Sequence, residues 1–183
     1  MNDRIVAIIH SIIGREKGYV NNPKDLGGET NWGITKQTAI LNGYTGKMFD
    51  LPRDLAFEIL MNQYFVEPHF DDVFKLAPSV AETLTDAGVL CGVRRAILWL
   101  QIALNALNRE QKLYHDIDED GSVGFRTLLS LREFLDHRSK QGETVLLRAL
   151  NCQIGSHFIS ISRSRPANEE FVYGWLLHRV NVV

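Results

Sequence analysis

Apolar residues recur at helical spacing along most of this chain, and turn residues separate the apolar stretches. Ile5, Ile8, Ile9 and Ile12 predict an amphipathic helix over residues 3–14. Thr35 has the character of an N-cap for a short helix that follows it. The further predicted helices cover residues 36–42, 51–65, 79–87, 93–107, 125–135, 143–162 and a last stretch that begins at 168. Because no β-α-β alternation interrupts this pattern, the sequence predicts an all-α bundle.

One segment breaks the helical pattern. Residues 15–35 read "REKGYVNNPKDLGGETNWGIT" and contain three carboxylates, four glycines and two aromatic residues, without an apolar repeat of core spacing. The end of this run, "GGETNWGIT", alternates small and β-tolerant residues and predicts a short hairpin. We therefore expect a helical bundle with one small, glycine-rich hairpin segment near residues 18–35.

The carboxylates of this segment are candidates for acid–base chemistry. Glu16 directly follows the first predicted helix, whose carboxyl end carries partial negative charge, and apolar neighbours would desolvate it. Both effects raise a carboxyl pKa, as a general acid requires, although a solvated glutamate in a turn fits the same spacing. Asp25 lies nine positions later in a turn and would be its partner. Thr30 follows the glycines and could position a water molecule.

Composition and charge narrow the class of protein. The chain has 183 residues, 45% of them hydrophobic, and a formal net charge of −2, so no basic field points to nucleic acid. The apolar stretch 89–107 contains Arg94 and Arg95, which indicates a buried helix rather than membrane insertion. The N-terminus lacks a signal-peptide pattern, so we expect synthesis in the cytoplasm.

Cys91 and Cys152 lie in apolar stretches and are expected to be buried free thiols.

Metal and cofactor motifs are weak. Residues 116–124, "DIDEDGSVG", begin like a calcium loop, but the twelfth position, which needs a bidentate glutamate, is Thr127. We therefore interpret this stretch as an acidic turn before the next helix. The six histidines show no ligand spacing, and no dinucleotide or phosphate-binding fingerprint occurs. The sequence predicts no metal and no cofactor.

The run "EKGYVNNPKDLGGETNWGIT" (16–35) resembles the signature of glycoside hydrolase family 108, the lysozyme-like muramidases of phages and bacteria. "DGSVGFRTL" (120–128) and "RPANEEFVYGWLLHRV" (165–180) are similar to that family's C-terminal predicted peptidoglycan-binding region. The resemblance implies a lysozyme-like fold, with a catalytic region at 1–88 and a helical C-terminal region at 89–183 packed with it as one compact unit. It also implies cleavage of the β-1,4 bond between N-acetylmuramic acid and N-acetylglucosamine.

Carried over by position, the resemblance assigns catalysis to Glu16, Asp25 and Thr30. The expected sugar-binding residues of the same segment are Tyr19, Asn21, Trp32 and Gly33, with plain packing as the alternative for the two aromatic side chains. The run departs from the family at several positions: Lys17 replaces a glycine, Asn22 an aspartate and Leu26 a proline, and Glu29 stands where the residue is often small. Leu90 also stands where the family motif has asparagine.

Three functions remain open from the sequence. The first is a muramidase acting on peptidoglycan glycan strands as a phage or prophage endolysin, which reaches the wall through a holin, an export system or lysis. The second is a lytic transglycosylase, which needs one catalytic glutamate and releases anhydro-sugars. The third is a non-catalytic wall-binding or secretion-assisting protein.

Overall fold

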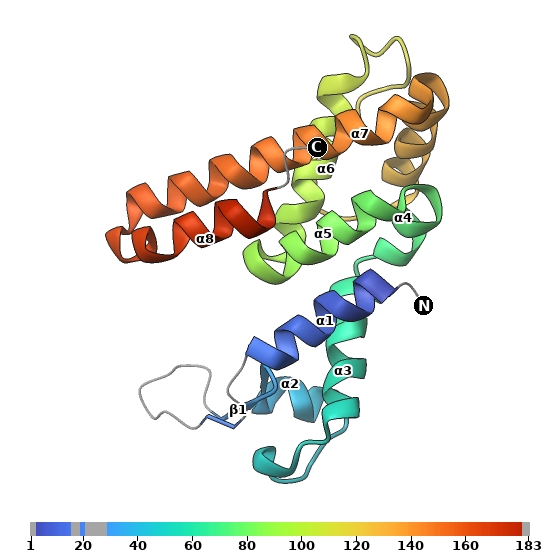
Figure 1. Cartoon of the computed structure of the whole chain (residues 1–183). Coiled ribbons are helices and arrows are strands. Elements are labelled where there is room, and N and C mark those ends of the chain that lie inside the picture. Colours follow the sequence, from blue (N-terminus) through green and yellow to red (C-terminus); the bar gives the residue numbers. More distant parts are fainter. Residues whose placement is uncertain (1–2, 16–18, 21–28, 181–183) are drawn as a thin grey trace. The chain divides into compact units, whose positions relative to one another are not determined.

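The computed structural model describes residues 3–15, 19–20 and 29–180 and divides the chain into two compact units, Met1–Pro68 and His69–Val183. Helices make up most of the described residues, and the strands found among them form one two-stranded hairpin (Figure 1). This arrangement confirms the predicted all-α fold with a small hairpin. Among the described helices, none combines the length and the apolar character that a membrane span requires.

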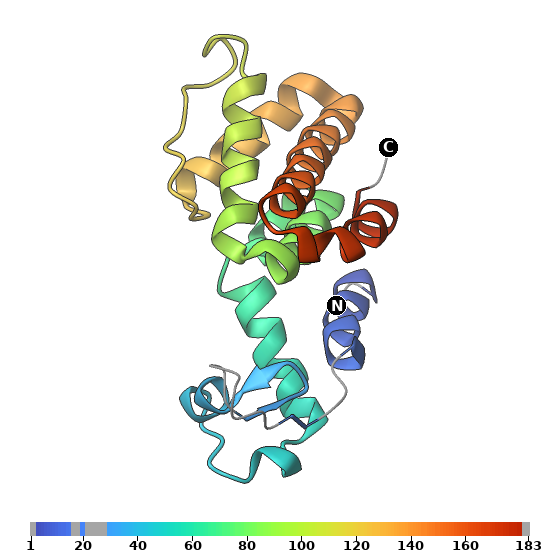
Figure 2. The same ribbon diagram turned by 90° about the vertical axis from the view of Figure 1, so that its left-hand side faces the viewer.

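The first unit contains the hairpin and a small helical core. Its elements are α1 (Asp3–Arg15), β1 (Thr30–Asn31), β2 (Ile34–Thr35), α2 (Lys36–Leu41), the 3-10 turn η1 (Met48–Asp50), α3 (Arg53–Met61) and the π-helical turn η2 (Asn62–Val66). The apolar stripe of α1 packs against α3, and Ile5, Ile9 and Ile13 are fully buried there. Figure 2 shows the hairpin joined directly to α2. As predicted, the Thr35 hydroxyl caps α2 by accepting the backbone N–H of Thr38 at 3.2 Å.

All of the secondary-structure elements described in the second unit are helical. It contains α4 (Phe70–Leu76), α5 (Pro78–Cys91), α6 (Val93–Leu107), α7 (Phe125–Ser164), the 3-10 turn η3 (Pro166–Asn168) and α8 (Glu169–Arg179). The sequence pattern missed α4, because the prolines on either side of it suggested a looser connection. The buried side chains of Phe70 and Val73 explain why this short segment is helical.

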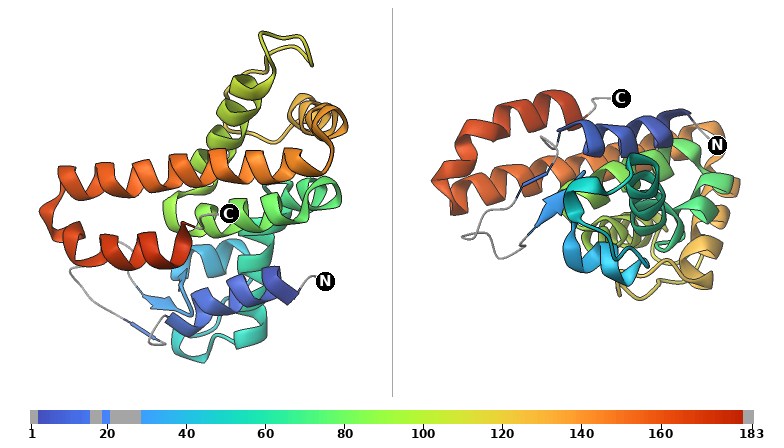
Figure 3. Two further views of the ribbon diagram at one scale, coloured as in Figure 1. Left: turned by 45° about the horizontal axis from the view of Figure 1, so that its top comes forward. Right: turned by 90° about the horizontal axis from the view of Figure 1, so that it is seen from below.

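Helix α7 is bent, so the two helices predicted for its residues are both present. Ser139 has φ 51° and ψ −147°, which is not helical and divides α7 into two parts. The second part runs beside α8 (Figure 3), and the ring centroids of Phe158 and Trp175 lie 5.3 Å apart between them. An ion pair between Arg179 and Asp86 also ties α8 to α5.

The connection between α6 and α7, here called the α6–α7 loop (residues 108–124), is irregular but well anchored. Gln101 of α6 is 1% exposed, donates to the Asp120 carboxylate at 2.8 Å and accepts the Gly121 N–H at 2.8 Å. The side-chain amide of Asn105 exchanges two hydrogen bonds of 2.9 Å with the backbone of Ile117. The hydrogen bond from Gln101 is the main reason why the pKa of Asp120 lies below its usual range. Side-chain amides of one helix thus hold the acidic turn that the sequence predicts here.

Candidate active site

The hairpin of the first unit closes with a two-residue turn. Thr30 pairs with Thr35 and Asn31 with Ile34, which leaves Trp32 and Gly33 at the turn with φ values of 55° and 80°. Two successive positive φ angles are typical of the type I′ turn that suits the twist of a hairpin. Glycine adopts this conformation at little cost, but a tryptophan needs support from its surroundings.

Trp32 receives that support from the core of the first unit. Its indole N–H donates to the backbone carbonyl of Leu51 at 2.9 Å, and its ring packs against the buried cluster that includes α1 and α3. The side chain is half-buried. Packing therefore accounts for part of its surface, and its role in sugar binding stays a prediction.

Asn31 anchors the hairpin to the turn η1. It is 2% exposed, and its amide nitrogen donates to the carbonyls of Met48 at 2.7 Å and Phe49 at 3.3 Å. Its amide oxygen is buried and has no hydrogen-bond partner among the described residues. These bonds position Phe49, which is 70% exposed and lies edge-on to Tyr19 with 5.7 Å between ring centroids. Sequence reasoning missed Phe49, because a lone phenylalanine between helices carries no pattern.

A backbone bridge fixes the two ends of the segment that carries Asp25. The N–H of Val20 donates to the carbonyl of Thr30 at 2.8 Å, and the N–H of Thr30 returns a bond of 2.9 Å. Val20 and Thr30 are thus neighbours, although nine residues separate them in the chain. Asp25 itself lies outside the described residues.

Glu29 forms the polar contact that joins the two ends of the site. Its carboxylate accepts the Tyr19 hydroxyl at 2.8 Å and the Lys36 ammonium at 2.6 Å. The hydrogen bond from Lys36, followed by that from Tyr19, holds the pKa of Glu29 below its usual range, so this carboxylate is ionised at neutral pH. The sequence marks Glu29 only as a departure from the family pattern, since its two partners lie ten positions before it and seven positions after it.

The structure places four of the seven residues that the sequence nominates. Tyr19 is half-buried beside Phe49, Thr30 lies in β1, and Trp32 and Gly33 form the hairpin turn. The remaining three lie outside the described residues: Glu16, Asn21 and Asp25. Leu90, the other departure from the family motif, is a half-buried residue of α5 in the second unit.

One group of metal-ligating side chains occurs among the described residues. His69, Asp71 and Asp72 can bring one ligand atom each to within 4.8 Å of the others. The Lys75 ammonium lies 2.7 Å from the Asp72 carboxylate and 4.0 Å from that of Asp71. This ammonium already supplies a cation to the group, and we assign no metal to it.

The cysteine prediction needs a correction. Both thiols are free, as expected, but Cys152 is exposed and Cys91 is only partly buried. Cys152 lies on α7, whose buried stripe passes through Leu150 and Ile154, so the apolar character of the surrounding sequence belongs to the other face of the helix. Burial raises the pKa of the Cys91 thiol to about 11.

The small hairpin on a helical core is in keeping with an all-α, lysozyme-like fold. The family model "Glycosyl hydrolase 108" matches residues 9–92, and the model "Predicted Peptidoglycan domain" matches residues 95–180. The first match covers a little under half of the chain, and the two matches together support a glycoside hydrolase that acts on peptidoglycan.

Comparison of structures supports the fold independently. The solved structure of Brucella abortus SagA is similar over 98% of both chains, with a TM-score of 0.55 and 23% sequence identity. At that identity the similarity is evidence for the fold alone. No curated protein matches the chain. The two family models meet between residues 92 and 95, whereas the compact units part after Pro68, so the expected division at residue 88 stays a prediction.

Proposed function

We propose that the chain is a muramidase that cleaves the β-1,4 bond between N-acetylmuramic acid and N-acetylglucosamine. Glu16 protonates the glycosidic oxygen as the general acid. Asp25, helped by Thr30, stabilises the developing oxocarbenium charge or activates a water molecule on the opposite face of the sugar. The second role would invert the anomeric centre, and the choice depends on the distance between the two carboxylates.

The observation that carries this proposal is the position of the three residues within the family match. Glu16, Asp25 and Thr30 all lie between residues 9 and 92, with the spacing of the family's signature run. Within the described part of the matched region, the hairpin follows this run directly.

The described flanks suit these roles. The last described residue of α1 is Arg15, and we expect Glu16 to lie at the partially negative end of this helix, where a carboxyl group tends to stay protonated. The Val20–Thr30 bridge gives the Asp25 segment two fixed ends. Tyr19 and Phe49 add an aromatic edge beside this bridge, of a kind that sugars contact through their apolar faces.

The test is the release of reducing ends from purified peptidoglycan by the wild-type chain and by Glu16→Gln. A required general acid contributes about 10²- to 10⁴-fold, so we expect a loss of that size in kcat with unchanged folding by circular dichroism. Glu58→Gln is the matched control, because Glu58 is an exposed glutamate of α3 in the same unit. Full activity in Glu16→Gln would refute the assigned role.

Asp25→Asn and the masses of the products separate hydrolysis from the alternative transglycosylase. Hydrolysis leaves reducing sugars and should depend on Asp25 almost as strongly as on Glu16. Products lighter by one water, formed equally well by Asp25→Asn, would identify a lytic transglycosylase instead.

We further propose that the chain acts on the wall after release from the cytoplasm, as phage and prophage endolysins do. Expression inside a bacterium with and without a co-expressed holin tests this route. We expect lysis only in the presence of the holin, and lysis without it would indicate a separate export route.

A further inference from the structure

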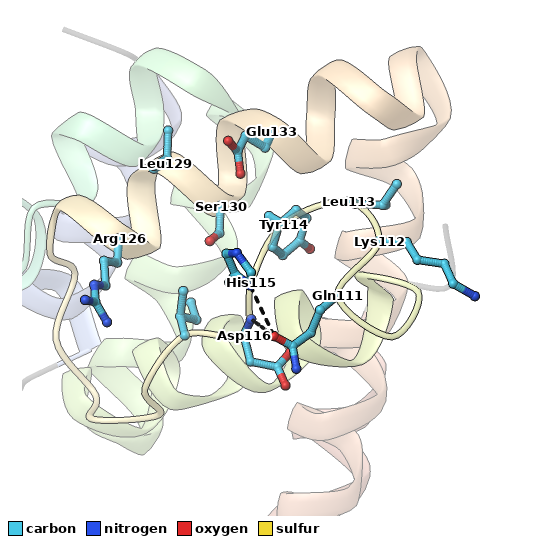
Figure 4. Close-up of a pocket in the computed structure, with 11 residues that line it drawn as sticks. Gln111, Lys112, Leu113, Tyr114, His115, Asp116, Arg126, Leu129, Ser130 and Glu133 are labelled. Atoms are coloured by element: carbon cyan, nitrogen blue, oxygen red, sulfur yellow. Dashed lines mark hydrogen bonds between the residues drawn. The ribbon is translucent and has the colours of Figure 1, made fainter.

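A pocket lies in the second unit. It has a volume of about 710 Å³, and its walls are residues 111–117 of the α6–α7 loop and one face of the first turns of α7 (Figure 4). All of its lining residues fall within the match to the predicted peptidoglycan domain. Nothing in the activity described so far uses this pocket.

The loop wall of the pocket has a strained backbone. Arg109, Glu110 and Gln111 have successive φ values of 59°, 58° and 62°, although none of them is glycine. Each such residue costs about 1–2 kcal/mol, so the conformation persists only where neighbouring contacts enforce it. Asn108 supplies contacts on both sides of this turn, since its side chain accepts the Gln111 N–H at 3.1 Å and donates to Asp116.

The buried side chain of Tyr114 also holds this loop wall in place. Tyr114 is 7% exposed, and its hydroxyl donates to the carbonyl of Leu104 at 2.7 Å. Strained and firmly anchored segments of this kind occur preferentially at ligand sites, where the protein uses the fixed geometry. The anchored Tyr114 ring lines the pocket but is almost completely buried. No exposed tyrosine, tryptophan or phenylalanine face therefore lines the pocket.

The helix wall carries polar groups without partners. Ser130 is 4% exposed and lines the pocket, yet its hydroxyl takes part in none of the hydrogen bonds found in the described part of the chain. Arg126 and Glu133 line the pocket on either side of it, and within the described residues neither enters an ion pair. The other two charged lining residues are engaged: Lys112 pairs with Glu110, and Asp116 accepts a hydrogen bond from Asn108.

The spacing of these groups sets the size of a ligand. Arg126, Ser130 and Glu133 stand at positions i, i+4 and i+7, which lie on one face of a helix. At 1.5 Å per residue the Cα atoms of Arg126 and Glu133 are separated by about 10 Å along the axis. An extended peptide advances about 3.3–3.6 Å per residue, so this distance corresponds to about three residues. Leu113 and Leu129 also line the pocket and provide apolar surface.

We propose that this pocket binds the stem peptide of peptidoglycan. The peptide carries free carboxylates, which Arg126 would bind, and in many walls a diamino acid whose amine Glu133 would bind, with Ser130 donating to a backbone carbonyl between them. A glycan strand fits less well, because sugars bind through exposed aromatic faces that this pocket lacks. The inference rests on peptidoglycan as the substrate and deepens the proposed function, but it does not depend on which residue is the general acid.

Isothermal titration calorimetry of the full chain with two kinds of soluble probe tests the proposal. The first kind is a tripeptide, either L-Ala-γ-D-Glu-meso-diaminopimelate or its L-Lys counterpart. The second kind is the β-1,4 tetramer of N-acetylglucosamine. We expect at least one tripeptide to bind. Arg126→Gln and Glu133→Gln should each raise its Kd by about 10- to 100-fold, since each removes a hydrogen bond to a charged group.

Two exposed residues of the same helix provide matched controls. Arg132→Gln and Asp136→Asn change the same kinds of charge outside the pocket lining, and they should leave Kd within about twofold. All four substituted positions lie on the surface or at the pocket rim, so their melting temperatures should equal that of the wild type.

Several results would overturn the proposal. They are the absence of binding by either tripeptide, binding that Arg126→Gln and Glu133→Gln leave unchanged, or binding of the sugar tetramer that these two variants abolish. The tripeptides contain no glycosidic bond, so Glu16→Gln should bind them as the wild type does. Loss of wall cleavage in that variant with retained tripeptide binding would separate the two proposals.

Discussion

The hairpin of the first unit and the α6–α7 loop of the second unit are held in place in different ways. Each is an irregular segment on a helical frame, and each contains residues other than glycine with positive φ. The hairpin forms from adjacent residues through a two-residue turn and needs one buried amide, Asn31, to attach it to the core. The loop has no ladder of its own, and side-chain amides from α6 and its C-terminal cap hold it. Local pairing therefore defines the first segment, and side chains from a neighbouring helix define the second.

The largest effect is expected from removing the central amide of the loop. Gln101→Leu leaves the buried Gly121 N–H without its partner, at a cost of about 1–3 kcal/mol, and also removes the hydrogen bonds from Gln101 to Asp120 and to the Ser122 carbonyl. We expect a loss of about 2–4 kcal/mol in the free energy of unfolding of the second unit, measured by urea denaturation. Gln141→Leu, at an exposed position of α7, should change it by less than about 0.5 kcal/mol. Equal effects of the two substitutions would contradict the anchoring role of Gln101.

The loop conformation itself is tested at Gly121. This residue has φ 73°, and a Cβ atom there would lie 2.5 Å from Cγ of Arg94 and 3.0 Å from its carbonyl oxygen. We expect Gly121→Ala to destabilise the second unit by about 1–3 kcal/mol. Gly124 has φ −105° and no atom within 4 Å of an added Cβ, so Gly124→Ala should have a much smaller effect. Thermal melts of the two variants provide the comparison. A stable Gly121→Ala protein would show that the loop adopts another conformation.

The corresponding experiment on the hairpin should have a smaller effect. Asn31→Ala removes two hydrogen bonds to η1, but it also removes an amide oxygen that is buried without a partner among the described residues. We expect a net loss of about 1–2 kcal/mol for the first unit, because the removed oxygen offsets part of the cost. Hydrogen exchange of the first unit measures it, and a loss larger than that of Gln101→Leu would reverse the comparison drawn here.

The smallest effect is expected at the surface pair of the hairpin. The pKa of Glu29 is lowered in the folded state, so the stability that it contributes is present above its unfolded pKa of about 4.3 and disappears as the pH falls through the lower folded value. The pKa of Lys36 is raised, so the same pair also weakens at alkaline pH, as the pH rises through the folded value of the lysine. Melting temperatures of the wild type and Glu29→Gln should therefore differ slightly at pH 7 and converge as the pH falls through the lowered folded pKa of Glu29. A difference that stays constant down to strongly acidic pH would exclude the ion pair as its cause.

Much of the frame was predictable, because helices follow from local spacing. The stripe Ile5–Ile9–Ile12, the Thr35 cap and the "NWGIT" turn specify α1, α2 and the hairpin with residues that are near one another in the chain. Helix α4 was missed, since its helical state depends on the burial of Phe70 and Val73 in the core of the second unit rather than on a long local repeat. The exposure of Cys152 was missed because a single apolar stretch does not reveal which face of a helix a residue occupies.

The candidate site, like the frame, has parts that the sequence predicted and parts that only the tertiary structure showed. The sequence alone nominated Glu16, Asp25 and Thr30, because acid–base chemistry needs such side chains and because their spacing resembles the family's signature run. The side chains of Gln101 and Asn105 bind residues twelve to twenty-six positions away, which the sequence pattern did not predict. Only the tertiary structure joined Tyr19 and Lys36 to Glu29 and placed Arg126, Ser130 and Glu133 opposite a strained loop. Hydrogen bonds and pockets form between residues that the fold brings together, whereas helical periodicity and motif spacing depend only on residues that are neighbours in the chain.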